Sequence, residues 1–293
     1  MFPEAARAVR ELKPKVVLFE NVKGLLRASF AKYFEYVVLQ ITHPDITKTD
    51  DESWENHLSR LEKHHTSGRH DGLHYRVVYR LLNAADYGVP QRRERVVIVG
   101  FRSDLNLEWS FPDPTHTQES LMWDKWVTGD YWERHRIAKG LRPEPPPETS
   151  RLVLLKNDWF APSAEPWRTV RDAIADLPDS NKPKASGKAL NHRLVPGARS
   201  YKGHTGSSLD EPAKTLKAGD HGVPGGENML AYADGTVRYF TVRESARLQT
   251  FPDDYAFFGS WTESMRQLGN AVPVELGHAV ARSVRDYLER ARS

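Results

Sequence analysis

The chain has 293 residues, 39% of them apolar and 28% charged, which is the balance of an ordinary soluble globular protein. Its formal net charge of +3 is too small to identify a partner, and the absence of cysteine excludes disulfides, thiolate metal sites and a thiol nucleophile in this chain. No apolar run approaches the roughly 18 residues of a membrane span, and the N-terminus lacks a signal-peptide layout, so the expected location is the cytoplasm.

The first part of the chain has the patterns of an α/β protein. Apolar residues at helical spacing predict an amphipathic helix over residues 2–12, and the apolar run 16–19 is typical of a buried parallel strand. Glu20 and Asn21 follow this strand directly, at the end where open α/β sheets place their ligands. Residues 23–36 are expected to form the next helix.

A polar insertion over residues 44–72 comes next. It carries a short helical stripe of apolar residues, interpreted as packing: Trp54, Leu58 and Leu61. Four histidines in or beside it invite a metal-binding interpretation: His64, His65, His70 and His74. That interpretation is disfavoured, because neither cysteine nor a carboxylate at ligand spacing accompanies them.

Two further strands are expected at residues 75–82 and 96–101, which are rich in β-branched residues. The pattern then dissolves into a region rich in Pro, Gly and Trp, in which Thr169–Asp172 resembles a capping box. Regular structure returns at Thr241, and Pro273 stands near the first turn of a closing helix. The predicted domains are a first catalytic portion, an irregular insert and a return to the catalytic domain: 1–103, 104–240 and 241–293.

Residues 180–209, the basic segment, contain no Asp or Glu but six Lys or Arg residues. A stretch of one sign suits contact with the phosphates of DNA, because each phosphate neutralised releases a condensed counterion. A solvated basic loop is an equally good interpretation of the charge pattern alone.

Four blocks of this sequence, in order, are similar to signature blocks of the cytosine-5 DNA methyltransferase family: Glu20–Val22, Gln91–Arg95, Arg243–Pro252 and Gly269–Pro273. Each block is weak evidence alone, but all four in order, with a variable region between the second and third, form a strong signal. The resemblance implies a partial Rossmann-like methyltransferase sheet with an inserted target-recognition domain. It further implies transfer of a methyl group from S-adenosyl-L-methionine to C5 of a cytosine flipped out of duplex DNA.

The resemblance also implies roles for single residues. In this family a cysteine thiolate adds to C6 of cytosine, while the glutamate equivalent to Glu20 acts at N3 and the arginine equivalent to Arg95 contacts O2. Arg93 would support the same pocket. Asn270 and Val272 would border the cofactor pocket. Contact with DNA is expected from two groups of cations, in the third block and the basic segment: Arg243 and Arg247, and Lys188, Arg193 and Arg199.

Simpler structural interpretations stand beside these roles. Glu20 could cap a helix, and Arg95 could form a surface ion pair. Arg243 and Arg247 could be helix-surface charges, whereas the resemblance implies that they hold the DNA backbone and brace the recognition domain.

The sequence departs from the family in lacking its glycine-rich cofactor-binding segment and its Pro-Cys nucleophile. We therefore expect the chain to be inactive alone and to need a partner that carries the N-terminal half of the enzyme. A split enzyme and a truncated fragment both fit, and a noncatalytic DNA-binding module is the alternative from another class. The strand at 16–19 should then have an unpaired edge, which favours association or aggregation.

Overall fold

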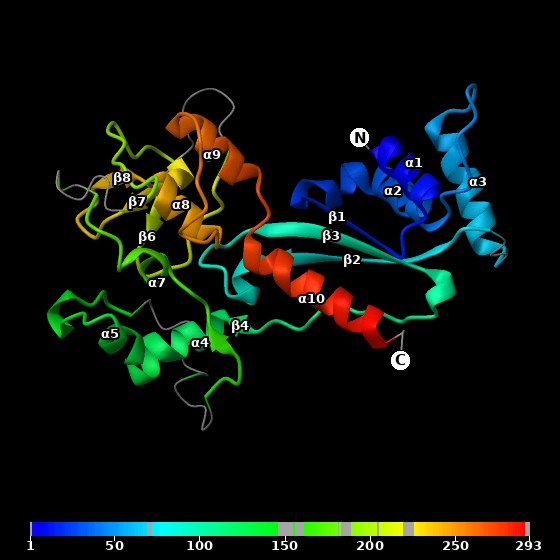
Figure 1. The fold of residues 1–293 in the computed structure, drawn as a ribbon. Helices are drawn as coiled ribbons and strands as arrows, with labels where there is room; N and C mark the ends of the chain where they lie inside the picture. Colours follow the sequence, from blue (N-terminus) through cyan, green and yellow to red (C-terminus); the bar gives the residue numbers. More distant parts are fainter. Residues whose placement is uncertain are drawn as a thin grey trace. The chain divides into compact units, whose positions relative to one another are not determined.

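A computed structural model describes residues 2–68, 72–145, 155, 161–180, 182, 189–203, 205–218 and 226–290. The chain divides into two units of mixed α/β structure, in agreement with the predicted class (Figure 1). The first unit comprises residues 1–82, 94–112 and 280–293, and the second comprises 83–93 and 113–279. Among the described helices, none is long and apolar enough to cross a membrane.

A three-stranded sheet forms the centre of the first unit, in the order β1 (Val16–Val22), β3 (Glu94–Arg102), β2 (Tyr75–Asn83). The central strand β3 is buried from Val96 to Phe101 because it has a neighbour on each side and cover on both faces. The prediction of a buried parallel strand at 16–19 was wrong. In the described sheet β1 pairs only with β3, antiparallel, and Leu18 and Val22 are 46% and 55% exposed.

The first unit also contains the helices α1 (Phe2–Leu12), α2 (Ala31–Thr42) and α3 (Trp54–Thr66). The apolar faces of α1 and α2 share a core with one face of the sheet, and this core includes Val9, Val37 and Ile98. Helix α3 packs on α2 through a separate cluster with Leu58 and Leu61. The predicted helix over 23–36 was wrong at its start, where two 3-10 turns, η1 (Lys23–Leu26) and η2 (Ala28–Phe30), precede α2. Extended backbone at Arg27 separates the two turns and prevents one continuous helix.

The second unit contains short elements around a separate core. They are η3 (Ala84–Tyr87), β4 (His116–Thr117), α4 (Gln118–Trp123), the π-helical turn η5 (Asp124–Thr128), α5 (Asp130–Arg134), η6 (Lys139–Leu141), β5 (Glu165–Pro166), α7 (Val170–Ile174), β6 (Ser207–Ser208), η8 (Gly226–Asn228), β7 (Met229–Ala231), β8 (Val237–Tyr239), α8 (Val242–Leu248) and α9 (Trp261–Asn270). One more 3-10 turn, η4 (Ser103–Leu105), belongs to the first unit, and α10 (Val274–Arg290) begins in the second unit and ends in the first.

The capping box at Thr169 is confirmed. The Thr169 hydroxyl accepts from the backbone N–H of Asp172, and the Asp172 carboxylate accepts from that of Thr169, which fixes the start of α7. The core of this unit joins α7, α8 and α9 through residues such as Val170, Leu248 and Leu268. Residues 241–279 thus pack with the insert, and the assignment of 241–293 to the catalytic domain remains a prediction.

Candidate catalytic and DNA-binding sites

Glu20 and Arg95 form an ion pair at the end of β1. In the antiparallel register Glu20 lies opposite Val97 and Val22 lies opposite Arg95, so the two charged side chains are diagonal neighbours on one face of the sheet. Arg95 Nε lies 2.7 Å from Glu20 Oε1, and Arg95 Nη1 donates to the backbone oxygen of Glu94 at 2.8 Å. The side chain of Arg95 is 11% exposed and that of Glu20 is 23% exposed, so the pair is largely buried but open to solvent on one side.

The electrostatics of this pair follow from its partial burial. Burial lowers the pKa of Arg95, and the carboxylate of Glu20 partly offsets that effect. An arginine keeps its charge under such conditions, so the site holds a fixed cation beside a carboxylate. A second and more exposed pair, Lys23 Nζ to Glu94 Oε2 at 2.8 Å, flanks the first. The site thus has alternating charges and little net charge.

Arg93 lies in the second unit, and its side chain has no exposed surface. Its guanidinium donates to three backbone oxygens: Leu216 at 3.0 Å, Gly269 at 2.6 Å and Ala271 at 2.9 Å. The side chain that sequence analysis assigned to the base pocket therefore ties together two distant segments, residues 216 and 269–271. This geometry gives Arg93 a positioning role.

The contacts of three further residues at this junction were not predicted, although Gln91 and Gly269 begin the second and fourth blocks. Gln91 donates to Leu248 O at 3.1 Å and accepts from Leu216 N at 2.9 Å, so one amide joins the second and third blocks. Asn228, fully buried, accepts from Lys217 N and donates to Lys217 O. At Gly269 an added Cβ would lie 2.3 Å from the backbone N of Ala218, so only glycine fits there. No local pattern marks these long-range contacts.

Asn270 is the last residue of α9, and Val272 lies in the turn that leads to α10. Asn270 is exposed and Val272 is half-buried. The carbonyls of Gly269 and Ala271, which flank Asn270, are the ones that Arg93 holds. The turn is therefore fixed in place, but these two residues supply only one amide and one apolar side chain toward a cofactor.

The two arginines of the third block have partners inside the second unit. Arg243 is 1% exposed and donates to the backbone oxygens of Leu190, Pro252 and Tyr255. Arg247 forms ion pairs with Asp176 and Asp253. Of the two expected roles, the bracing of the insert agrees with this geometry, whereas Arg243 offers no surface to a DNA phosphate.

The basic segment is anchored at His192, and the described cations that follow it are exposed. His192 is buried between Thr241 Oγ1 and Pro178 O, at 2.9 and 2.7 Å. The side chains of Arg193 and Arg199 are exposed, which suits either phosphate contact or simple solvation. Lys188 and His70 lie outside the described residues.

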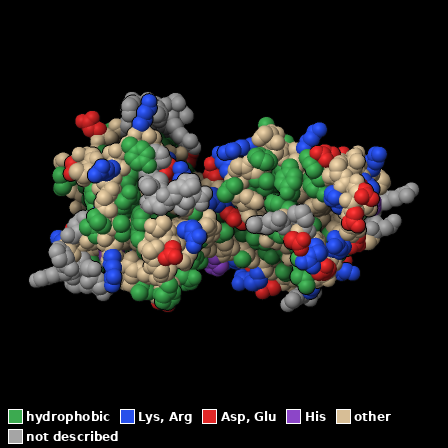
Figure 2. All heavy atoms as spheres, turned by 90° about the horizontal axis from the view of Figure 1, so that it is seen from above, with side chains coloured by type: hydrophobic (Ala, Val, Ile, Leu, Met, Phe, Trp, Pro, Cys, Tyr) green, Lys and Arg blue, Asp and Glu red, His purple; other side chains and the backbone are tan. Residues whose placement is uncertain are grey.

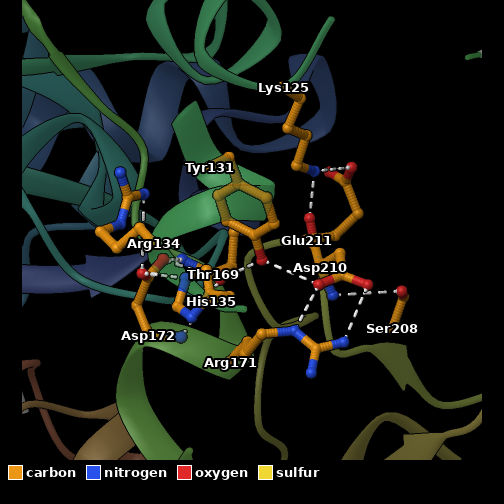
Figure 3. Close-up of polar contacts among 10 residues, drawn as sticks. All are labelled: Lys125, Tyr131, Arg134, His135, Thr169, Arg171, Asp172, Ser208, Asp210 and Glu211. Atoms are coloured by element: carbon orange, nitrogen blue, oxygen red, sulfur yellow. Dashed lines mark hydrogen bonds and ion pairs between the residues drawn. The ribbon is translucent and has the colours of Figure 1, made fainter. Parts of the chain in front are cut away.

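A polar network supports the insert (Figure 3). Arg171 binds both carboxylate oxygens of Asp210, at 2.6 and 3.1 Å, and the Tyr131 hydroxyl joins Asp210 to Thr169 at 2.9 and 3.0 Å. Burial alone would raise the pKa of Asp210, but its hydrogen bonds from Arg171 and Tyr131 outweigh that effect and lower it. A cavity of about 940 Å³ lies beside the pair, lined by apolar residues that include Trp126, Trp132 and Tyr232.

Comparison with known proteins agrees with the motifs. The family of C-5 cytosine-specific DNA methylases matches residues 1–43 and 56–286, and the chain belongs to that family. The chain is 31% identical to the type II methyltransferase M.NgoFVII of Neisseria gonorrhoeae, over 99% of this chain and 64% of that protein. It is 30% identical to M.XorII of Xanthomonas oryzae pv. oryzae, over 97% of this chain and 61% of that protein.

The chain thus spans less than two thirds of the length of these curated relatives. Among solved structures, the Dnmt2 methyltransferase of S. pombe matches 94% of this chain and 68% of that chain, at 14% identity and a TM-score of 0.43.

Proposed function

We propose that this chain is part of a DNA cytosine-5 methyltransferase, the complete form of which transfers a methyl group from S-adenosyl-L-methionine to C5 of cytosine in duplex DNA. The observation that carries the proposal is the Glu20–Arg95 pair, held on one face by the β1–β3 register and accessible from one side. Membership of the C-5 cytosine-specific DNA methylase family supports it.

Glu20 and Arg95 suit the activation of a cytosine that has been flipped out of the stack. A carboxyl at N3 can share a proton with the ring, and a guanidinium can donate to O2 with a fixed geometry. The contacts to Glu20 and Glu94 O use Nε and Nη1 of Arg95, which leaves Nη2 as the atom directed to the base. Arg95 also holds the Glu20 carboxyl in place for this task.

The nucleophile must come from another polypeptide segment, because this chain contains no cysteine. Most of the residues that bind S-adenosyl-L-methionine must likewise come from another polypeptide segment. Asn270 and Val272 offer far less contact than a ligand of that size needs, so they do not form such a site by themselves. We infer a complementing α/β segment, equivalent to the part of the relatives that this chain does not match.

The edge strand β1 is the docking position that we infer for this segment. Its side chains Leu18 and Val22 are exposed, and nearby Phe30 is 47% exposed. In the space-filling view, apolar side chains of this unit gather in patches between charged ones (Figure 2). A strand added to β1 would pair its free backbone groups and cover this apolar surface.

The substitution Glu20→Gln tests the proposal in a reconstituted enzyme. Glutamine keeps the shape but cannot share a proton with N3, so we expect turnover to fall by about 100-fold or more while DNA binding changes little. Glu94→Gln is the matched control, because Glu94 is a nearby carboxylate paired with Lys23. Equal turnover of the Glu20 variant and the wild type would remove Glu20 from the mechanism.

The absence of cysteine also suits a second function, that of a noncatalytic DNA-binding module. In that case Glu20 and Arg95 would serve stability alone. Salt-dependent binding of duplex DNA, with no methyl transfer in the presence of any Cys-bearing partner, would favour this alternative.

A further inference from the structure

Four histidine rings gather where α2, α3 and the start of β2 meet in the first unit. His43, directly after α2, is 2% exposed, and its Nε2 lies 3.0 Å from Nδ1 of His65 on α3. The ring of His43 also lies 4.8 Å from that of His64 and 5.2 Å from that of His74. The residues described here contain no group of three ligands suited to a metal ion.

The contact between His43 and His65 needs a neutral imidazole. A ring nitrogen accepts a hydrogen bond only when it carries no proton, so one of the two rings must be uncharged. Protonation of both rings would leave two donors facing each other, beside two more imidazoles. A charge on the buried ring of His43 would also lose its hydration.

A fifth imidazole, separate from these four, also links α2 and α3. His57 on α3 is buried, and its Nε2 donates to Ile46 O at 2.8 Å, so its Nδ1 is free to accept from the Tyr36 hydroxyl of α2 at 2.9 Å. Burial lowers the pKa of His57. The packing of α3 on α2 depends on this neutral ring. Its contribution to stability is therefore fully present above the ordinary imidazole pKa of about 6.5 and decreases as the pH falls below that value.

Charged groups around the cluster come from three elements. Arg10 of α1 donates to Pro44 O, next to His43, and adds a positive charge to this side. Asp45 is the nearby carboxylate, and it accepts from the backbone N–H of Leu73. Arg60 of α3 is paired with Glu52, which precedes that helix. Asp45 therefore supplies a single negative charge, which could not neutralise several protonated imidazoles.

We propose that α3 is held on α2 by an acid-labile latch of neutral imidazoles, formed by His43, His57, His64, His65 and His74. The apolar interface beneath the latch is small, with Leu58 and Leu61 of α3 packed on Tyr36 and Leu39 of α2. Protonation can therefore release α3 without unfolding the sheet.

Hydrogen exchange of the full chain, read by mass spectrometry at low micromolar concentration with EDTA present, tests this proposal. After correction for intrinsic exchange, the opening constant of α3 should rise by about fivefold between pH 6.5 and 5.5, the rise expected for uptake of one proton by an imidazole whose pKa in the open state is about 6.5. Peptides from β3 should show no comparable rise. His65→Gln, at an exposed rim position, should reduce the rise in α3 to about threefold or less.

His278→Gln is the matched control, because His278 is an exposed helix residue in the second unit, and its variant should keep the wild-type rise. The proposal would be overturned if the opening constant of α3 did not change with pH. It would also be overturned if His65→Gln and His57→Gln both kept the wild-type dependence of this constant on pH. Equal opening of α3 and β3 would indicate acid unfolding of the whole unit and contradict the proposal. Opening of α3 by EDTA alone at pH 7.5 would make the cluster a metal site and overturn the proton mechanism.

Discussion

Replacement of Arg93 by alanine should destabilise the second unit strongly. The guanidinium has no exposed surface and donates to Leu216 O, Gly269 O and Ala271 O at 2.6 to 3.0 Å. A hydrogen bond with a charged partner contributes about 1.5–3 kcal/mol, so loss of all three should cost about 4 kcal/mol or more. A typical domain is stable by only about 5–15 kcal/mol, so much of the margin would disappear.

Urea unfolding followed by tryptophan fluorescence measures this change, because Trp132 and Trp167 are buried in the second unit. We expect the midpoint to fall by about 1.5 to 2 M urea at an ordinary slope. Arg93→Lys should lose less, because an ammonium group can still reach one carbonyl. The neighbouring exposed Arg92 gives the control, Arg92→Ala. Equal midpoints for the two alanine variants would refute the positioning role of Arg93.

Three further predictions concern packing, pH and association. Gly269→Ala should destabilise the second unit by about 1–3 kcal/mol or more, because the added Cβ would meet the backbone of Ala218. The control Gly140→Ala, where the space is open, should not destabilise it. Equal urea midpoints for the two variants would contradict this prediction. Because the pKa of Asp210 is lowered in the fold, its contribution to stability is present above about pH 3.9 and lost as the pH falls through the lowered value. Asp210→Asn should therefore flatten the acid limb of the stability curve, and an unchanged limb would count against it. Leu18→Lys should reduce self-association of the isolated chain in light scattering, since Leu18 lies exposed on the edge strand; a monodisperse wild-type monomer would contradict the premise.

Local signals in the sequence predicted much of the fold. Periodicity located α1, β2, β3 and the closing helix, and the side-chain pattern at Thr169 predicted its capping box. These features depend on residues a few positions apart, which a sequence displays directly. The unpaired edge of β1 was expected, but its antiparallel pairing with β3 did not follow from its apolar run, because distant residues set the pairing partner of a strand.

The same distinction applies to the candidate site. Glu20 and Arg95 were predicted to act together, and the structure pairs them because the β1–β3 register places them diagonally on one face. Arg93 stands two positions before Arg95, yet its partners lie more than a hundred residues away. Sequence spacing carries no information about such contacts. For the same reason the contacts of Gln91 and Gly269, which begin two of the signature blocks, were not predicted, and Asn228 was not singled out.

Methyl transfer itself tests the central claim most directly. The assay measures labelled methyl groups passed from S-adenosyl-L-methionine to cytosine in duplex DNA, first by this chain alone and then with added polypeptide. The added polypeptide carries the glycine-rich segment and the Pro-Cys nucleophile, and is sought in the DNA adjoining this gene. We predict no transfer by the chain alone and clear transfer by the mixture, with loss of transfer in Glu20→Gln. Methyl transfer to C5 by this chain alone, which has no cysteine, would contradict the proposed division of the active site.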